Sequence, residues 1–132
     1  SFLSCCIAKE LLDKGYSVLY FSSSQLFDTL KESDFGKDSK ENLYTSKEDI
    51  YNCDLVVIDD LGTELTNSFV LSELFSLITE RTLRNKSTII STNLSLTDLS
   101  NVYSERIISR IISNFELCKM SGPDVRIYKK QY

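Results

Sequence analysis

The run Leu55 to Ile58, which Asp59 and Asp60 follow at once, constrains the fold more than any other stretch of this sequence. Four apolar residues in a row predict a strand buried on both faces, because a strand with one face in water would alternate apolar and polar residues. Such a strand lies in a sheet that helices cover on both sides. An unpaired carboxylate is costly to bury, so two of them at the strand's end predict a site where something neutralises their charge.

Helices and strands alternate along the rest of the chain, judged from apolar spacing, caps and turn residues. This alternation predicts βαβ units in a mostly parallel sheet, hence an α/β fold within one domain over residues 1–132. In the first part of the chain, the predicted elements are a helix over 1–15 ended by Gly15, a strand over 16–21, a helix over 25–33, and a polar loop over 34–46. A short helix over 47–51, the strand over 55–59 and a long helix capped by Thr66 follow. The last predicted elements are a strand over 87–92, a short helix from 96, a second helix over about 104–114, and a hairpin with arms 115–120 and 125–130.

The composition argues against several classes of protein. The chain is 42% hydrophobic and 26% charged, as soluble globular domains are, and no apolar run reaches the ~20 residues that span a bilayer, so no membrane partner is expected. The net charge of −4 argues against attraction of the whole chain to nucleic acid, while a local basic patch remains open. A zinc site is not expected, because the chain has no histidine and no C-x-x-C pair. Its four cysteines suit a reducing cytoplasm.

Polar residues follow two of the predicted strands at their carboxyl ends, where parallel sheets bind ligands. Asp59 and Asp60 end one strand, and Asn93 follows the next. Successive strand side chains point to opposite faces, so the two acids converge only if the backbone bends after Asp59. Carboxylates at a strand end suit Mg²⁺. The alternatives stay open: an acidic turn or helix cap for the acids, and a turn or cap for Asn93.

Arg106 and Arg110 lie four residues apart on one side of a predicted helix, opposite an isoleucine stripe. No carboxylate is available to either at helical contact spacing, and like charges at that spacing repel. Because the planar guanidinium suits phosphate oxygens, the pair predicts an anionic ligand from outside the helix. A solvated helix face is the alternative.

The order of these motifs, "LVVIDDLGTE", a helix, "STIISTN", "ERIISRI" and a final hairpin, resembles the AAA+ ATPase domain of bacterial helicase loaders of the DnaC/DnaI type, with the transposition helper IstB as a close relative. The resemblance covers nearly the whole chain. It implies a P-loop NTPase (AAA+) three-layer sandwich with a C-terminal β-hairpin, and ATP and Mg²⁺ as cofactors.

The resemblance also implies roles for individual residues. The family more often has glutamate at the position of Asp60, and Arg126 has an ordinary hairpin arginine as its alternative reading. The implied roles are Asp59 as the Mg²⁺-associated acid of Walker B, Asp60 as the catalytic acid, Asn93 as sensor 1, Arg110 as the arginine finger that reaches a neighbouring subunit's ATP, Arg106 as its companion, and Arg126 as a candidate sensor-2-like contact.

One departure from the family is large, because the Walker A pattern G-x-x-x-x-G-K-[ST] is absent from the chain. The opening residues look like the helix that follows the phosphate loop, with Ser1 as the motif's final hydroxyl and a Mg²⁺ ligand. We therefore expect an N-terminally truncated domain whose first strand and lysine lie upstream, and which does not hydrolyse ATP alone.

The function implied by the resemblance is ATP-dependent loading of the replicative DNA helicase, with single-stranded DNA binding and self-association in an AAA+ oligomer. An IstB-like helper of a transposase and a degenerate, non-hydrolysing interaction module are the alternatives. Arg81, Arg84 and Lys86 are candidate DNA contacts, and a cationic helix terminus is the other reading of this group.

Overall fold

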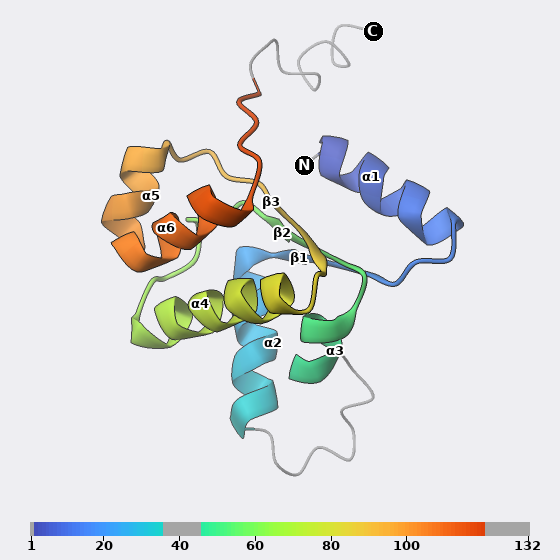
Figure 1. Cartoon of the computed structure of the whole chain (residues 1–132). Coiled ribbons are helices and arrows are strands. Elements are labelled where there is room, and N and C mark those ends of the chain that lie inside the picture. Colours follow the sequence, from blue (N-terminus) through green and yellow to red (C-terminus); the bar gives the residue numbers. More distant parts are fainter. Residues whose placement is uncertain (1, 36–45, 121–132) are drawn as a thin grey trace, which may run out of the picture.

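The computed structural model of the chain describes residues 2–35 and 46–120, and within these ranges its centre is a parallel sheet (Figure 1). The strands are β1 (Val18–Ser22), β2 (Leu55–Asp59) and β3 (Ser87–Ile90), in the spatial order β1-β2-β3. Val57 of the central strand lies opposite Tyr20 on one side and Ile89 on the other. The predicted parallel α/β sheet is confirmed, and β2 has the predicted bounds.

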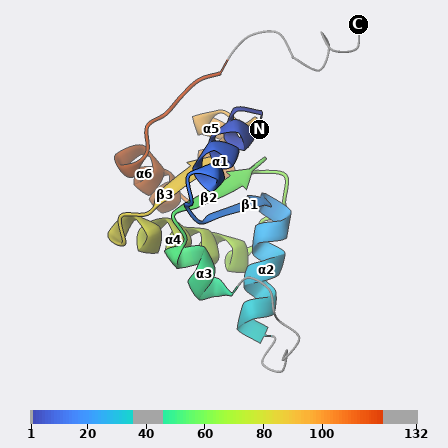
Figure 2. The same cartoon turned by 90° about the vertical axis from the view of Figure 1, so that its right-hand side faces the viewer.

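Helices cover both faces of the sheet, which makes three layers (Figures 1 and 2). Helix α1 (Phe2–Asp13) lies on one face. Helices α2 (Ser23–Phe35), α3 (Lys47–Asn52) and α4 (Ser68–Leu83) lie on the other. Two further helices, α5 (Leu96–Val102) and α6 (Glu105–Asn114), follow β3, and α6 packs against α4.

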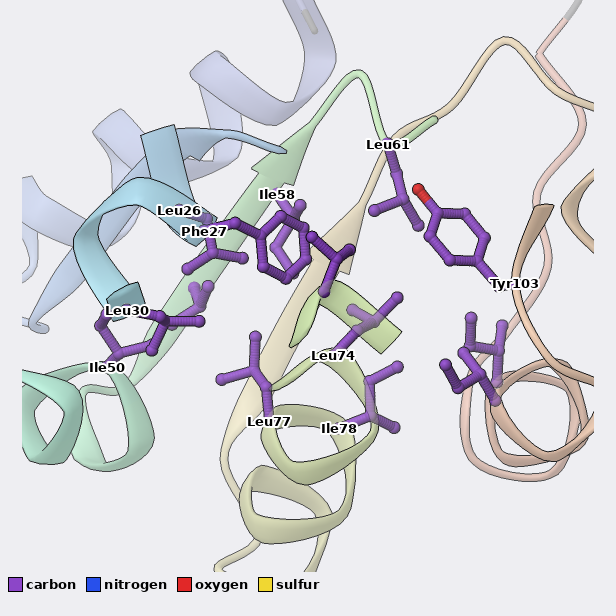
Figure 3. Close-up of a cluster of buried hydrophobic side chains, with 14 of the residues drawn as sticks. Leu26, Phe27, Leu30, Ile50, Ile58, Leu61, Leu74, Leu77, Ile78 and Tyr103 are labelled. Carbon is purple, nitrogen blue, oxygen red and sulfur yellow. The ribbon is translucent and has the colours of Figure 1, made fainter. Parts of the chain in front are cut away.

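The central strand is buried from both sides, as its apolar run predicts. Each of its four apolar residues is at most 2% exposed. Val56 and Ile58 belong to the larger core cluster with α2, α4 and α6, part of which Figure 3 shows. Leu55 and Val57 pack instead with Ala8 of α1. Because side chains alternate along a strand, this division places Asp59 on the face of Leu55 and Val57.

Several predicted boundaries are wrong. Strand β1 spans Val18–Ser22 and not 16–21, and helix α2 spans Ser23–Phe35 and not 25–33. The N-cap of α4 is Asn67, not Thr66: its side-chain oxygen accepts a hydrogen bond from the Val70 amide at 2.9 Å, as cap geometry requires. Strand β3 ends at Ile90 and not at residue 92, because its partner β2 ends at Asp59 and the backbone turns away at Asp60.

The predicted C-terminal hairpin is not formed by its first arm, since residues 115–120 carry no strand. A strand needs a partner to satisfy its backbone groups, and the predicted partner, residues 125–130, lies outside the described residues. Among the helices of the described ranges, none is long and apolar enough to cross a membrane.

Candidate functional site

The two acids at the end of β2 lie on either side of a sharp backbone bend. Asp59 closes the strand and is half-buried, whereas Asp60 is exposed and has φ of 56°, in the left-handed region. Few residues other than glycine adopt this region, and aspartate is one of them. The bend after Asp59 that convergence of the two acids requires is therefore present.

Ser91, the first residue after β3, binds the whole bend. Its backbone N–H donates to the Ile58 carbonyl at 2.9 Å, and its carbonyl accepts from the Leu61 amide at 2.9 Å. Its hydroxyl donates to Oδ1 of Asp59 and accepts from the Asp60 amide at 3.3 Å. The sequence-based site contained Asn93 from this segment and missed Ser91.

The Glu64 carboxylate, in the loop after the bend, accepts hydrogen bonds from three parts of the chain. Its Oε2 accepts from the Gly62 amide at 2.9 Å and from the hydroxyl of the fully buried Ser23 at 2.8 Å, and its Oε1 accepts from the Tyr103 hydroxyl. Figure 3 shows Tyr103 beside Leu61 of this loop. Burial, together with the hydrogen bond to Glu64 and its negative charge, raises the pKa of Tyr103.

The loop after the acids requires glycine at position 62. Gly62 has φ of 107°, which side-chain-bearing residues rarely adopt, and a Cβ there would lie 2.5 Å from Cδ1 of Leu94. The loop and the segment after β3 therefore approach each other closely, with Thr92 donating its hydroxyl to the Leu61 carbonyl at 2.6 Å.

No lysine or arginine of the described ranges forms an ion pair with Asp59 or Asp60, so no side-chain cation there compensates these acids. The same ranges hold no cluster of three or more His, Cys, Asp or Glu side chains that would form an all-protein metal cage. A carboxylate and a neighbouring hydroxyl are hard oxygen donors, and Mg²⁺ is bound through one or two carboxylates with several waters retained. The residues present therefore fit a magnesium ion.

Tyr20 of β1 approaches Asp59 from the other neighbouring strand. Burial, a hydrogen bond with Cys5 of α1, and the negative charge of Asp59 all raise the pKa of Tyr20. Sequence reasoning missed this tyrosine because only the register of the folded sheet brings it near the acid.

The predicted arginine pair lies elsewhere, exposed on α6. The guanidiniums of Arg106 and Arg110 lie 4.0 and 5.6 Å from the ring centroid of Phe75 on α4. Among the described residues, neither guanidinium pairs with a carboxylate, and neither contacts Asp59 or Asp60. The two arginines therefore lack an ion pair with a described carboxylate, as predicted, and their guanidiniums make cation–π contacts with the Phe75 ring.

The other predicted residues make no described hydrogen bond or ion pair to the acids, or lie outside the described residues. Asn93 is exposed, and its side chain makes no hydrogen bond to another described residue. Ser1 and Arg126 lie outside the described residues. Arg81 is fully buried and therefore not a DNA contact, whereas Arg84 pairs with Glu48 at 2.9 Å.

The chain is similar in sequence to proteins of a known family. A sequence model of the family of IstB-like ATP binding proteins matches residues 1–131. The replicative helicase loader DnaC of Escherichia coli strain K12 is 26% identical over 113 residues, which make up 83% of this chain and 44% of that protein. The chain thus spans less than half the length of the curated relatives it matches.

Solved structures show the same fold. The crystal structure of a DnaC helicase loader has a TM-score of 0.70 and 31% sequence identity, over 87% of this chain and 68% of that one. AMPPCP-bound DnaA from Aquifex aeolicus, with a TM-score of 0.68 and 21% identity, covers 94% of this chain and 38% of its own, and agrees in fold. The chain has an AAA+ P-loop type fold, is similar to DnaC helicase loaders, and belongs to the family of IstB-like ATP binding proteins.

Proposed function

We propose that this chain is the nucleotide-binding part of a protein that uses ATP and Mg²⁺ to load the replicative DNA helicase onto single-stranded DNA. The relatives named as replicative helicase loaders support the loading role, and the family of ATP binding proteins supports the nucleotide. A transposase helper with the same ATPase domain is the second candidate, which the family match favours.

Asp59 is the magnesium-binding acid of this proposal, in the Walker B position. The observation that carries it is a carboxylate at the end of a strand buried on both faces, with no ion pair from a described lysine or arginine. When bound, Mg²⁺ neutralises charge on the nucleotide phosphates. Ser1 would supply a second oxygen ligand.

Asp60 and Asn93 would act on the nucleophile and on the terminal phosphate. Asp60 is exposed and turned out of the strand by its left-handed backbone, so its carboxylate is free to orient the attacking water and accept its proton. Asn93 would donate its amide to a phosphate oxygen as sensor 1. Arg126 would contribute a late sensor-2-like contact.

Arg110 would act from a neighbouring subunit, with Arg106 beside it. Both arginines are exposed and lack carboxylate partners in the described ranges, as an anion-binding pair from one subunit to the next requires. The proposal therefore includes self-association of the full-length protein.

Asp59→Asn in the full-length protein tests the site. We expect the Mg²⁺ concentration that half-saturates ATP hydrolysis to rise by about tenfold or more, because the ligand charge is lost. Asp28→Asn, the same change on the exposed face of α2, is the matched control and should leave the titration unchanged. An unaltered Mg²⁺ titration for Asp59→Asn would refute the assignment.

A helicase-loading assay separates the two candidate functions. The protein should deposit a replicative helicase on single-stranded DNA in an ATP-dependent manner. If ATP hydrolysis is intact and loading fails, while an associated transposase is stimulated, the loader role is wrong and the transposase helper is right.

A further inference from the structure

Ser91, two positions before Asn93, is the residue after β3 that forms hydrogen bonds to both acids. Four hydrogen bonds join it to four consecutive residues of the neighbouring chain, from Ile58 to Leu61. Two of these bonds come from its backbone, so any residue at position 91 would form them. The other two come from its hydroxyl and depend on the side chain.

The hydroxyl suits this double role because it has one donor and two acceptor sites. It donates its proton to Oδ1 of Asp59 and accepts the amide proton of Asp60. The first bond fixes the rotation of the carboxylate about its side-chain bonds. The second holds Asp60 in its left-handed backbone conformation, which persists only where the surroundings impose it.

The carboxylate of Asp59 retains room for a cation after these contacts. An ionised carboxylate has about four lone-pair sites on its two oxygens. Ser91 takes one on the β3 side, and the Tyr20 phenol lies near the same group on the β1 side. Hydroxyl groups from both neighbouring strands thus flank the acid without neutralising it.

We propose that Ser91 is a positioning residue for the metal-binding acid: its hydroxyl orients the Asp59 carboxylate toward the cation and holds the Asp60 turn in place. This inference rests on the proposed magnesium site and adds a residue to it. Hydrogen bonds of this kind to a metal-binding side chain raise the affinity for the metal, because they hold the side chain in its binding orientation before the metal arrives.

Mn²⁺ is the probe, since electron paramagnetic resonance measures its binding directly without turnover. In the full-length protein with a non-hydrolysable ATP analogue, Ser91→Ala should raise the Mn²⁺ dissociation constant by about 10- to 100-fold. Ser91→Thr keeps the hydroxyl and should bind within about threefold of the unaltered protein. Ser87→Ala removes a hydroxyl from the other end of β3 and is the matched control.

The outcomes separate this inference from the proposed function. Unaltered Mn²⁺ affinity in Ser91→Ala, together with lost affinity in Asp59→Asn, overturns the role of Ser91 and leaves the magnesium site standing. Unaltered affinity in both variants refutes the site itself. If Ser91→Ala does not fold, Ser91→Cys replaces it, because a thiol of similar shape is a weak donor and should still weaken Mn²⁺ binding.

Discussion

Arg81 carries a positive charge into the interior of the protein without an ion pair from any carboxylate of the described ranges. Its guanidinium donates to the carbonyl oxygens of Ile50 at 2.7 Å and Ser87 at 2.6 Å, and to the Thr88 hydroxyl at 2.9 Å. Burial lowers its pKa. The side chain thus ties the end of α3 and the start of β3 to α4.

Arg81→Met should lower the free energy of unfolding by about 3 kcal/mol, because the buried Ile50 carbonyl and two partly buried acceptors lose their donor. Thermal unfolding of the full-length protein measures the loss as a lower midpoint. Arg84→Met is the control, since Arg84 is partly exposed and its ion pairs with Glu48 and Glu80 lie at the surface. Equal midpoints for the two variants would show that the buried contacts contribute no more than surface ones.

The sequence identifies functional residues that stand out from their neighbours along the chain. It misses residues whose role depends on contacts with distant segments. Asp59 and Asp60 stand out because they interrupt an apolar run. Arg81 resembles an ordinary cationic helix end, and only the carbonyl groups of α3 and β3 reveal its burial. Ser91 reaches Asp59 across 32 positions of sequence, a contact that no spacing pattern encodes.

At the scale of elements, the hydrogen bond between Tyr103 and Glu64 joins the loop after β2 to the junction of α5 and α6. Glu64 belongs to the segment that holds the acids, and Tyr103 lies two residues before the helix that carries the arginine pair. A double-mutant cycle of Tyr103→Phe and Glu64→Gln should give a coupling free energy of about 1 kcal/mol.

Thermal unfolding of the four proteins of this cycle provides the measurement, and Tyr16→Phe, which alters an exposed tyrosine, is the control. Additive effects of the two changes would mean that the two elements are held together by apolar packing alone. The Leu61 and Tyr103 contact in the core would then carry that role.

The elements themselves were predictable where apolar period and caps agree. Strand β2 has the predicted bounds because its whole apolar run is buried, and α6 (Glu105–Asn114) nearly matches the helix predicted over about 104–114. The start of α4 was not predictable, because Thr66 and Asn67 are both acceptable N-caps and only the fold selects one of them. Residues 115–120 were predicted to form a strand and form none, since β-propensity cannot supply a pairing partner.

At the scale of the whole molecule, the acids and the arginine pair occupy separate places on one chain. The acids lie at the carboxyl end of β2, and the arginines lie on α6 against Phe75. No described contact joins them within the chain, so the joint role in ATP hydrolysis that we propose predicts two copies in a head-to-tail arrangement, with the arginine of one beside the acid of the next.

Subunit mixing tests this arrangement in the full-length protein. Arg110→Ala should bind ATP normally and lose about 10³-fold or more in hydrolysis. Asp60→Asn, which removes the proposed proton acceptor, should also be nearly inactive. A mixture of the two should regain activity, because roughly one interface in four then pairs an intact acid with an intact arginine. Lys31→Ala, which removes an exposed charge from α2, is the control for the arginine variant. A mixture that stays as inactive as its components would place Arg110 outside the ATP site, as an arginine that only stacks on Phe75.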